Sequence, residues 1–427
     1  MNREEVMNFI DNSKKFGSKL ELERIKKLCE LLGNPQDKLK LIHIAGTNGK
    51  GSTSLYIHNA LVDAGYKTGL YTSPFIYEFN ERIQINGVPI PDDDLAGIMS
   101  TVADNVKIMT DEGYEHPTEF ELITAAAFLY FEKSECDIVV LEVGLGGTFD
   151  ATNIIKAPVL SVITSISLDH TDYLGNTVVE VARNKCGIIK EGVPVLSYMY
   201  QPNDVIDVIK ETAKKFNSPF TLATDESLEI NSMCLDGSNF LYRGEDYHTN
   251  LVGKYQIYNA ITAISAVKLL NEAGFRISAE NIKNGLSQAK WPARFEILNQ
   301  TPLVIADGSH NADGMRAFIE TAKDVIDKKA ICVFGMLKDK DYEYCIKRLS
   351  EITDTVVVTE VDNPRRETVD KLSQTAKKYI KNVYEEREND DAVKKALELA
   401  GDCGTVIALG SLYMMKNIKD AIKKENL

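Results

Sequence analysis

The sequence lacks the features of a secreted, membrane-spanning or nucleic-acid-binding protein. Its seven cysteines are odd in number and scattered, without a C-x-x-C pair, which predicts reduced thiols and a cytoplasmic location. No apolar run is long enough to span a bilayer, and residues 1–16 lack the apolar segment of a signal peptide. The formal charge of −14 argues against a general nucleic-acid binder, whose surface is normally basic. We therefore expect a protein without nucleic-acid or membrane partners.

The chain is long enough for two or three domains around a sizeable core. It has 427 residues, of which 44% are hydrophobic and 26% charged. In its first part, apolar runs typical of buried strands alternate with helical segments. Strands are expected at 39–45, 67–71, 137–143, 158–164 and 193–196, and helices at 3–32, 53–64, 92–112, 119–133 and 177–186. This alternation predicts an α/β fold with a doubly wound, mostly parallel sheet.

The later residues predict a small antiparallel subsheet and then a second α/β domain. Residues 219–251 contain short strand-like pieces separated by turn signals, and helices are expected at 255–272 and 278–287. A second alternation follows, with strands at 303–306, 330–334, 355–359 and 405–409, which is typical of a Rossmann-like domain. We therefore predict an N-terminal domain over residues 1–295 and a C-terminal domain over residues 296–427.

The stretch 39–54, LKLIHIAGTNGKGSTS, predicts a phosphate-binding loop. A buried strand is followed by the glycine-rich turn 46–52 and a helix start, so that backbone N–H groups would point at a ligand. Lys50 would add a positive charge for a terminal phosphate. The pattern departs from G-x-x-x-x-G-K-[ST], because Ile44 stands at the first glycine and the hydroxyl after Lys50 is displaced to Ser52. The alternative is a strand–helix turn without a ligand.

Glu142 ends an otherwise apolar strand, where an unpaired buried carboxylate would be costly. A Mg²⁺ ion next to the phosphate loop would satisfy it; the alternatives are exposure to solvent or pairing with a lysine. Ser73, at the exit of the adjacent strand, is a candidate hydroxyl ligand, although alone it is typical of a turn. Taken singly, His170 has no preferred role and Lys185 is an ordinary surface lysine. The six histidines show no spacing typical of a zinc site.

A set of short motifs keeps one order along nearly the whole chain. They are GTNGKGS (46–52), YTSPF (71–75), FNERI (79–83), LEVGLGG (141–147), DATN (150–153), LDHT (168–171), WPARFE (291–296), DGSHN (307–311), GMLKDKD (335–341) and GSLY (410–413). Together they resemble folylpolyglutamate synthase/dihydrofolate synthase, a branch of the Mur ligase superfamily. The resemblance implies an N-terminal ATPase domain and a C-terminal Rossmann-like domain. It also implies that the substrates are ATP, a reduced folate and L-glutamate, and we expect a monomer.

The resemblance further implies roles for individual residues of this chain. ATP would be held by the loop residues Thr47, Asn48, Gly49, Lys50, Gly51 and Ser52, with Asn259 and Arg294 contacting the nucleotide and Asp307 and His310 reaching it from the second domain. Ser73, Glu142 and His170 would bind Mg²⁺. Lys185 would be an N-carboxylated lysine that helps to hold a second Mg²⁺. Lys50, Lys185 and His170 would then be the catalytic residues.

The implied reaction activates a carboxylate with ATP. Transfer of the γ-phosphoryl group would give an acyl phosphate, and the amine of glutamate would then displace phosphate to form an amide. Thr148 stands in GGTFD where bifunctional relatives often have arginine, which favours a folylpolyglutamate synthase and leaves dihydrofolate synthesis open. The alternatives are a bifunctional enzyme and, from another class, an ATPase or switch without ligase activity.

Overall fold

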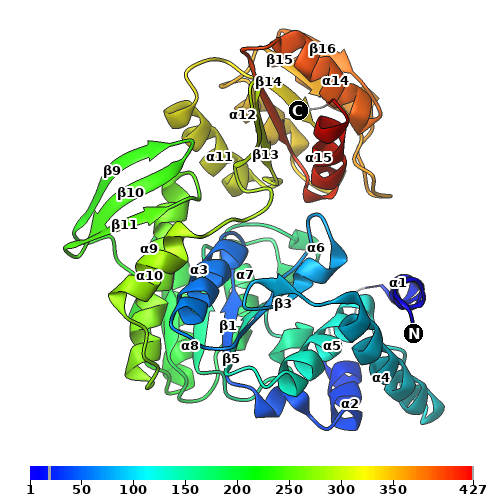
Figure 1. The fold of residues 1–427 in the computed structure, drawn as a ribbon, viewed down its shortest axis with the longest axis vertical. Coiled ribbons are helices and arrows are strands. Elements are labelled where there is room, and N and C mark those ends of the chain that lie inside the picture. The colour runs from blue at the N-terminus through cyan, green and yellow to red at the C-terminus, as the bar shows by residue number, and fades with distance from the viewer. Residues whose placement is uncertain (18–20, 426–427) are drawn as a thin grey trace. The chain divides into compact units, whose positions relative to one another are not determined.

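The chain folds into two units, each with its own sheet and core (Figure 1). The computed structural model describes residues 1–17 and 21–425. Unit 1 comprises Met1–Glu226 and Tyr258–Ala289, and unit 2 comprises Ser227–Ile257 and Lys290–Leu427. The predicted antiparallel subsheet therefore packs with the second unit, although the sequence-based boundary at residue 295 had placed it in the first domain. As functional domains, 1–295 and 296–427 stay a prediction.

The main sheet of unit 1 has eight strands in the order β4-β3-β2-β5-β1-β6-β7-β8. Its strands are β1 (Leu41–Ala45), β2 (Thr68–Tyr71), β3 (Ile83–Ile85), β4 (Val88–Pro89), β5 (Ile138–Glu142), β6 (Leu160–Ile163), β7 (Val195–Ser197) and β8 (Phe220–Leu222). The β2–β3 and β3–β4 pairs are antiparallel, and all other neighbouring strands of this sheet pair parallel. Every residue of β1 and β5 is buried, as expected for strands covered on both faces. The predicted doubly wound, mostly parallel sheet is confirmed.

The helices of unit 1 depart from the prediction at the N-terminus. They are α1 (Arg3–Ser13), α2 (Glu23–Leu31), α3 (Lys50–Asp63), α4 (Asp92–Asp111), α5 (Glu119–Lys133), α6 (Thr171–Leu174), α7 (Val178–Lys185), α8 (Asn203–Lys215), α9 (Lys254–Glu272), which begins in unit 2, and α10 (Ala279–Ser287). The short 3-10 helices are η1 (Lys14–Phe16), η2 (Pro35–Lys38), η3 (Phe79–Arg82), η4 (Ala151–Ile154) and η5 (Cys186–Ile188). A single helix over 3–32 is wrong, because Gly17 adopts a φ of 65° and ends the first helical segment. Residues 18–20 lie outside the described part.

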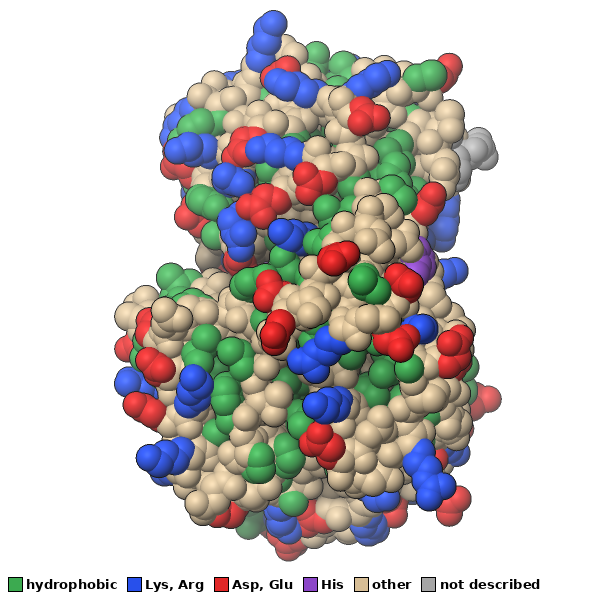
Figure 2. Space-filling model, turned by 90° about the vertical axis from the view of Figure 1, so that its left-hand side faces the viewer, with side chains coloured by type: hydrophobic (Ala, Val, Ile, Leu, Met, Phe, Trp, Pro, Cys, Tyr) green, Lys and Arg blue, Asp and Glu red, His purple; other side chains and the backbone are tan. Residues whose placement is uncertain are grey.

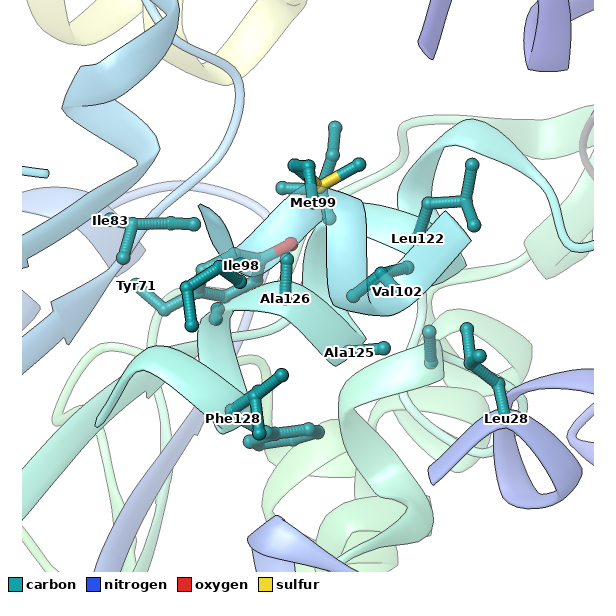
Figure 3. Close-up of a cluster of buried hydrophobic side chains, with 14 of the residues drawn as sticks. Leu28, Tyr71, Ile83, Ile98, Met99, Val102, Leu122, Ala125, Ala126 and Phe128 are labelled. Atoms are coloured by element: carbon teal, nitrogen blue, oxygen red, sulfur yellow. The ribbon is translucent and has the colours of Figure 1, made fainter. Parts of the chain in front are cut away.

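One face of the main sheet packs on α2, α4 and α5. Figure 3 shows Tyr71 of β2 and Leu28 of α2 in the same buried cluster as Met99 of α4 and Phe128 of α5. Removing such apolar side chains from water contributes roughly 25 cal/mol per Å² of buried surface. This packing fixes β2 and β5, and with them the strand ends that carry the site.

Helix α3 packs against β1, β2 and β5 and is itself covered by α10. The two helices approach so closely that a Cβ atom at Gly285 of α10 would lie 2.6 Å from the Ala60 nitrogen of α3. Only glycine permits this backbone approach. Because α3 is held in this way, its first residue, Lys50, has a fixed position next to the end of β1.

Unit 2 contains a six-stranded sheet in the order β12-β13-β17-β14-β15-β16 and a separate three-stranded sheet in the order β11-β10-β9. The strands are β9 (Leu228–Cys234), β10 (Gly237–Tyr242), β11 (Glu245–Thr249), β12 (Glu296–Gln300), β13 (Leu303–Asp307), β14 (Ile331–Phe334), β15 (Thr355–Val358), β16 (Asn382–Glu385) and β17 (Thr405–Leu409). The helices are α11 (Ala312–Val325), α12 (Tyr342–Leu349), α13 (Val369–Ala376), α14 (Asn389–Ala400), η6 (Leu412–Met414) and α15 (Met415–Lys424). In the large sheet only β12 pairs antiparallel.

The sequence found the buried strands of unit 2 and missed its edges. The predicted strands β13, β14, β15 and β17 are confirmed. β12 and β16 were not predicted, because these edge strands are half-buried or exposed and lack an apolar run. The expected antiparallel subsheet exists but begins at Leu228, since β8 pairs parallel with β7 at the edge of the main sheet.

Lys and Arg side chains are interspersed with Asp and Glu over the face shown in Figure 2. No helix within residues 1–17 and 21–425 has the length and apolar character needed to cross a membrane.

Candidate active site

The phosphate loop lies between β1 and α3, in the strand–loop–helix order that the sequence predicted. Lys50 is the first residue of α3, so the unpaired N–H groups of the first helical turn lie next to the loop. At two positions of the loop, a side chain larger than that of glycine would clash with a neighbouring residue. A Cβ at Gly46 would lie 1.8 Å from Thr164 Oγ1, and one at Gly49, whose φ is 84°, would lie 2.5 Å from Asn259 Oδ1. The structure thus brings Asn259 of α9 against the loop.

The loop is bound to the segment that follows β6. Thr47 N donates to Ser165 O at 2.7 Å, and Asn48 N donates to the same oxygen at 3.3 Å. The Thr47 hydroxyl donates to Ser167 O at 2.9 Å and accepts from Ser167 N at 3.1 Å. These four hydrogen bonds hold the first half of the loop in one conformation.

Glu142 lies at the carboxyl end of β5, and only 4% of it is exposed. Because Tyr71 pairs with Leu141, the residues that follow β2 lie next to the end of β5. Ser73 N lies 3.4 Å from Glu142 Oε2, and Lys50 Nζ lies 3.9 Å from Glu142 Oε1. The structure therefore gathers Ser73, Lys50 and Glu142 at one point. It also shows the lysine pairing that the sequence left open for Glu142.

Lys185 is not the surface lysine that it resembles when taken alone, since only 5% of it is exposed. Its Nζ atom donates to Gly46 O at 2.7 Å, directly under the phosphate loop. Burial, and then the positive charge of Lys50, lower the pKa of Lys185 from 10.5 to about 7, against the opposing charges of Asp169 and Asp150. A substantial fraction of this amine is therefore neutral near pH 7.

The loop that follows Glu142 packs on the helix end that carries Lys185. A Cβ at Gly147 would lie 2.7 Å from both Asn184 O and Lys185 O, so glycine allows the two backbones to touch. Thr148 N and Thr148 Oγ1 both donate to Asn184 O at 3.0 Å. The glycines of LEVGLGG therefore bring Lys185 under the loop.

A buried polar chain, which sequence reasoning missed, ties this region to β1. His43 Nε2 lies 2.8 Å from Thr152 Oγ1, whose hydroxyl donates to Asp150 Oδ1 at 2.5 Å, and Leu145 N donates to Asp150 Oδ2 at 2.7 Å. Burial lowers the pKa of His43 to about 3 and raises the pKa of Asp150. His43 is thus a neutral histidine that holds Thr152. The only sequence signal was a histidine inside an apolar strand.

His170 lies at the start of α6, with its side chain exposed to solvent and its backbone at a φ of 50°. Its backbone N–H donates to Asp169 Oδ1 at 2.8 Å. The charge of Asp169 acts on Lys185, which places this loop on the Lys185 side of the site. The proposed role of His170 as a metal ligand stays a prediction.

The residues present are chemically suited to Mg²⁺, which prefers oxygen ligands. Glu142 supplies a buried carboxylate beside a loop built for phosphate, and Ser73, whose backbone N lies 3.4 Å from that carboxylate, carries a hydroxyl. Within the described ranges, no group of three or more His, Cys, Asp and Glu side chains forms a metal cluster. A Mg²⁺ ion at this point would therefore take further ligands from its phosphate partner and water, as is usual for Mg²⁺ at nucleotide sites.

A second group of predicted site residues lies together in unit 2. Asp307 ends β13, and its carboxylate accepts from Phe295 N and Ser309 N, both at 2.8 Å. A Cβ at Gly308 would lie 2.7 Å from Arg294 Nη1, and His310 Nδ1 donates to Gly308 O at 2.8 Å.

Burial raises the pKa of Asp307, and the charge of Arg294 opposes this effect. A charged Arg294 and a buried Asp307 therefore lie at the carboxyl end of a parallel strand. That edge of an open α/β sheet is where ligands bind.

The two domain-family matches fit this architecture. Residues 44–267 match the Mur ligase middle domain, and residues 293–412 match the glutamate ligase domain of the Mur ligases. Together with the fold and the phosphate loop, they define the class of the protein as a Mur ligase.

The similar proteins and solved structures identify which branch of the Mur ligases the chain belongs to. The dihydrofolate synthase/folylpolyglutamate synthase of Bacillus subtilis is 39% identical over 429 residues, covering 98% of this chain and 99% of that protein. A Mycobacterium tuberculosis folylpolyglutamate synthase, solved with ADP and AMPPCP, matches with a TM-score of 0.88 and 28% identity, over 99% of this chain and 97% of that one. An FPGS–AMPPCP–folate complex matches with a TM-score of 0.86 and 32% identity, over 99% and 100% of the two chains. The chain belongs to the folylpolyglutamate synthase/dihydrofolate synthase family.

Proposed function

We propose that the chain is an ATP-dependent amide ligase that adds L-glutamate to the γ-carboxyl of a reduced folate. The observation that carries the proposal is the phosphate loop with Lys50 at its end and the buried Glu142 and Lys185 beside it. Membership of the family supports the identity of the substrates. Related structures were solved with ADP, AMPPCP or folate, which supports ATP and folate as ligands of this chain.

The loop supplies what phosphoryl transfer to a carboxylate needs. A carboxylate is a poor acyl donor, and transfer of the ATP γ-phosphoryl group to its oxygen gives an acyl phosphate and ADP. The N–H groups of the first turn of α3 and the charge of Lys50 would stabilise the negative charge that develops in this step. The amine of glutamate then attacks the acyl carbon, the amide bond forms, phosphate leaves and the amine loses a proton.

We place Mg²⁺ at Ser73, Glu142 and His170, and a second Mg²⁺ at Lys185. When bound, Mg²⁺ supplies positive charge to phosphate oxygens and orients them. The lysine would act as a carbamate: its neutral amine adds to CO₂, an N–C bond forms and one proton is released, which turns the neutral amine into an anion. The lowered pKa of Lys185 supports this step, because only the neutral amine reacts. One N–H remains in the carbamate for the hydrogen bond to Gly46 O.

The remaining predicted contacts complete the nucleotide site. Asn259, which lies against Gly49, and Arg294 would contact the nucleotide, while Asp307 and His310 would reach it from the second domain. We keep residues 1–295 as the ATP-binding domain and 296–427 as the C-terminal domain. Because water hydrolyses an acyl phosphate, we expect water to be excluded from the site during turnover.

A bifunctional enzyme that also joins dihydropteroate to glutamate is the second candidate. It is favoured by the Bacillus subtilis relative, which is named for both activities. Our preference for a dedicated folylpolyglutamate synthase rests on Thr148. Its hydroxyl is bound back to Asn184 O, and a Cβ at Gly187 would lie 2.2 Å from it, so this side chain packs against the end of α7.

The deciding experiment is ADP release with ATP, Mg²⁺ and L-glutamate, comparing tetrahydrofolate with dihydropteroate as the acceptor. We expect glutamate-dependent release with tetrahydrofolate. Turnover with dihydropteroate as well would establish the bifunctional enzyme. ADP release that ignores glutamate would mean an ATPase or switch and would overturn the ligase proposal.

A further inference from the structure

We propose that Gln201 is a positioning residue that keeps the phosphate loop in its ligand-binding conformation. It does so through the segment that follows β6, residues 164–167, which we call the β6 exit. Gln201 lies four residues beyond the end of β7, and no motif of the sequence marks it. The inference rests on the proposed nucleotide site and adds a residue that controls it from outside.

The side-chain amide of Gln201 is buried, with 7% of the residue exposed, and bridges two backbone groups of the β6 exit. Gln201 Nε2 donates to Thr164 O at 2.8 Å, and Ile166 N donates to Gln201 Oε1 at 3.0 Å. The partners are a carbonyl and an N–H group, so they fix which amide atom points where. The two bridged groups belong to the residues directly before and after Ser165.

Ser165 is the residue whose carbonyl accepts from Thr47 N and Asn48 N. The same segment continues to Ser167, which exchanges two hydrogen bonds with the Thr47 hydroxyl. Gln201 therefore holds the β6 exit, and the β6 exit holds the loop. The side-chain hydrogen bonds of Gln201 go to the β6 exit and not to the loop, which is why its role is one of positioning.

Nothing in the strand ladder replaces this bridge. β6 ends at Ile163 and β7 at Ser197, so the sheet pairing stops before Thr164 O and Ile166 N are reached. Both residues are buried, and a buried backbone group without a partner is costly. Without the amide, the β6 exit would move to regain partners, and Thr47 and Asn48 would move with it. The segment also leads to His170, so its position bears on the proposed metal ligand.

The test compares Gln201→Met with the matched change Asn271→Leu. Asn271, at the end of α9, makes the same kind of bridge: its Nδ2 donates to Ile277 O and its Oδ1 accepts from Ile277 N, both at 2.9 Å. Each substitution removes two backbone hydrogen bonds and keeps the side-chain size. The readouts are the Kd of ADP with Mg²⁺ by titration calorimetry and amide hydrogen exchange of peptides covering 46–52 and 164–168 in the ligand-free full chain.

We expect Gln201→Met to raise the Kd of ADP about tenfold, because a loop that is competent only about a tenth of the time binds that much more weakly. Exchange of both peptides should accelerate, while Asn271→Leu should match the wild type in both readouts. A Kd within twofold of the wild type, with unchanged exchange, would overturn the proposal.

A second variant keeps the test decisive if Gln201→Met does not fold. Gln201→Glu retains an acceptor for Ile166 N, but it loses the donor to Thr164 O and sets a second acceptor oxygen against that carbonyl, so we expect a rise in Kd with faster exchange of residues 164–168. Unchanged exchange in this variant would also count against the role. If the wild-type chain bound no ADP, the proposed function would fail, and the ligand-free exchange comparison would still decide whether Gln201 holds the loop.

Discussion

Replacing Lys185 with methionine should make the protein more stable at neutral pH and abolish its activity. The amine is buried under the phosphate loop, and burial lowers its pKa from 10.5 to about 7. The folded chain therefore carries a group that is more costly to protonate than in the unfolded chain. Methionine fills a similar volume without a charge, so the substitution removes this cost.

The magnitude follows from linkage between protonation and folding. Between pH 7 and pH 10.5 the unfolded chain binds more protons at this site than the folded chain, so wild-type stability rises with pH over that window. With about 1.4 kcal/mol per pH unit, burial of Lys185 costs about 4 kcal/mol at pH 7 and about 2 kcal/mol at pH 9. Losing the hydrogen bond to Gly46 O offsets about 1 kcal/mol of the gain.

The net gain for Lys185→Met is therefore about 3 kcal/mol at pH 7 and about 1 kcal/mol at pH 9. Above pH 10.5 it becomes a slight loss. The assay is urea unfolding followed by far-UV circular dichroism at several pH values, in buffer free of CO₂, so that no carbamate forms. Lys26→Met, on the exposed side of α2, is the control and should show no such trend.

A variant that is less stable than the wild type at pH 7, or a gain that does not shrink as pH rises, would refute the reasoning. Lys185→Met also tests the proposed catalytic role of Lys185, and Lys185→Ala tests whether that role belongs to a carbamate. We expect no turnover without added carboxylate and partial rescue of Lys185→Ala by small carboxylates such as acetate. Full activity of either variant would remove the proposed carbamate from the mechanism.

Three further changes test the site and its support. Gly46→Ala should abolish ADP binding measured by calorimetry, because the new Cβ would lie 1.8 Å from Thr164 Oγ1, and Thr164→Ala in the same chain should restore part of it. Glu142→Ala should abolish the Mg²⁺-dependent turnover while the circular dichroism spectrum stays native; turnover with an unchanged dependence on Mg²⁺ would take Glu142 out of the metal site. Arg24→Met should lower the free energy of unfolding by about 3–5 kcal/mol in urea titrations, because it leaves Glu121, its partner at 3.0 Å, as a charge buried without that partner. A loss below about 1 kcal/mol would mean that water or other groups already stabilise Glu121.

The parts of the site that follow from strand order were predictable from the sequence. Apolar runs such as 137–143 indicated strands buried on both faces, and the polar residues that follow such strands meet at one edge of a parallel sheet. That reasoning predicted Ser73 and Glu142 beside the phosphate loop, and in the structure Glu142 Oε2 lies 3.4 Å from Ser73 N while Glu142 Oε1 lies 3.9 Å from Lys50 Nζ. Such a prediction requires only the direction of each strand and the identity of the strand that lies next to it.

The burial of side chains from helices and loops was not predictable, because it depends on how closely two backbones approach. Lys185 has the sequence context of an exposed helical lysine. It is buried because glycine at 147 lets the loop after β5 touch the end of α7, and because its amine reaches the carbonyl of Gly46. Gln201 is a stronger case, since its function is defined by two backbone groups that belong to another strand exit. A pattern along the chain records neither contact. Residues that hold a site without touching its ligand are therefore found in the structure and not in the sequence. The sequence features that allow the close backbone approaches around Lys185 and the phosphate loop are the glycines at positions 46 and 147.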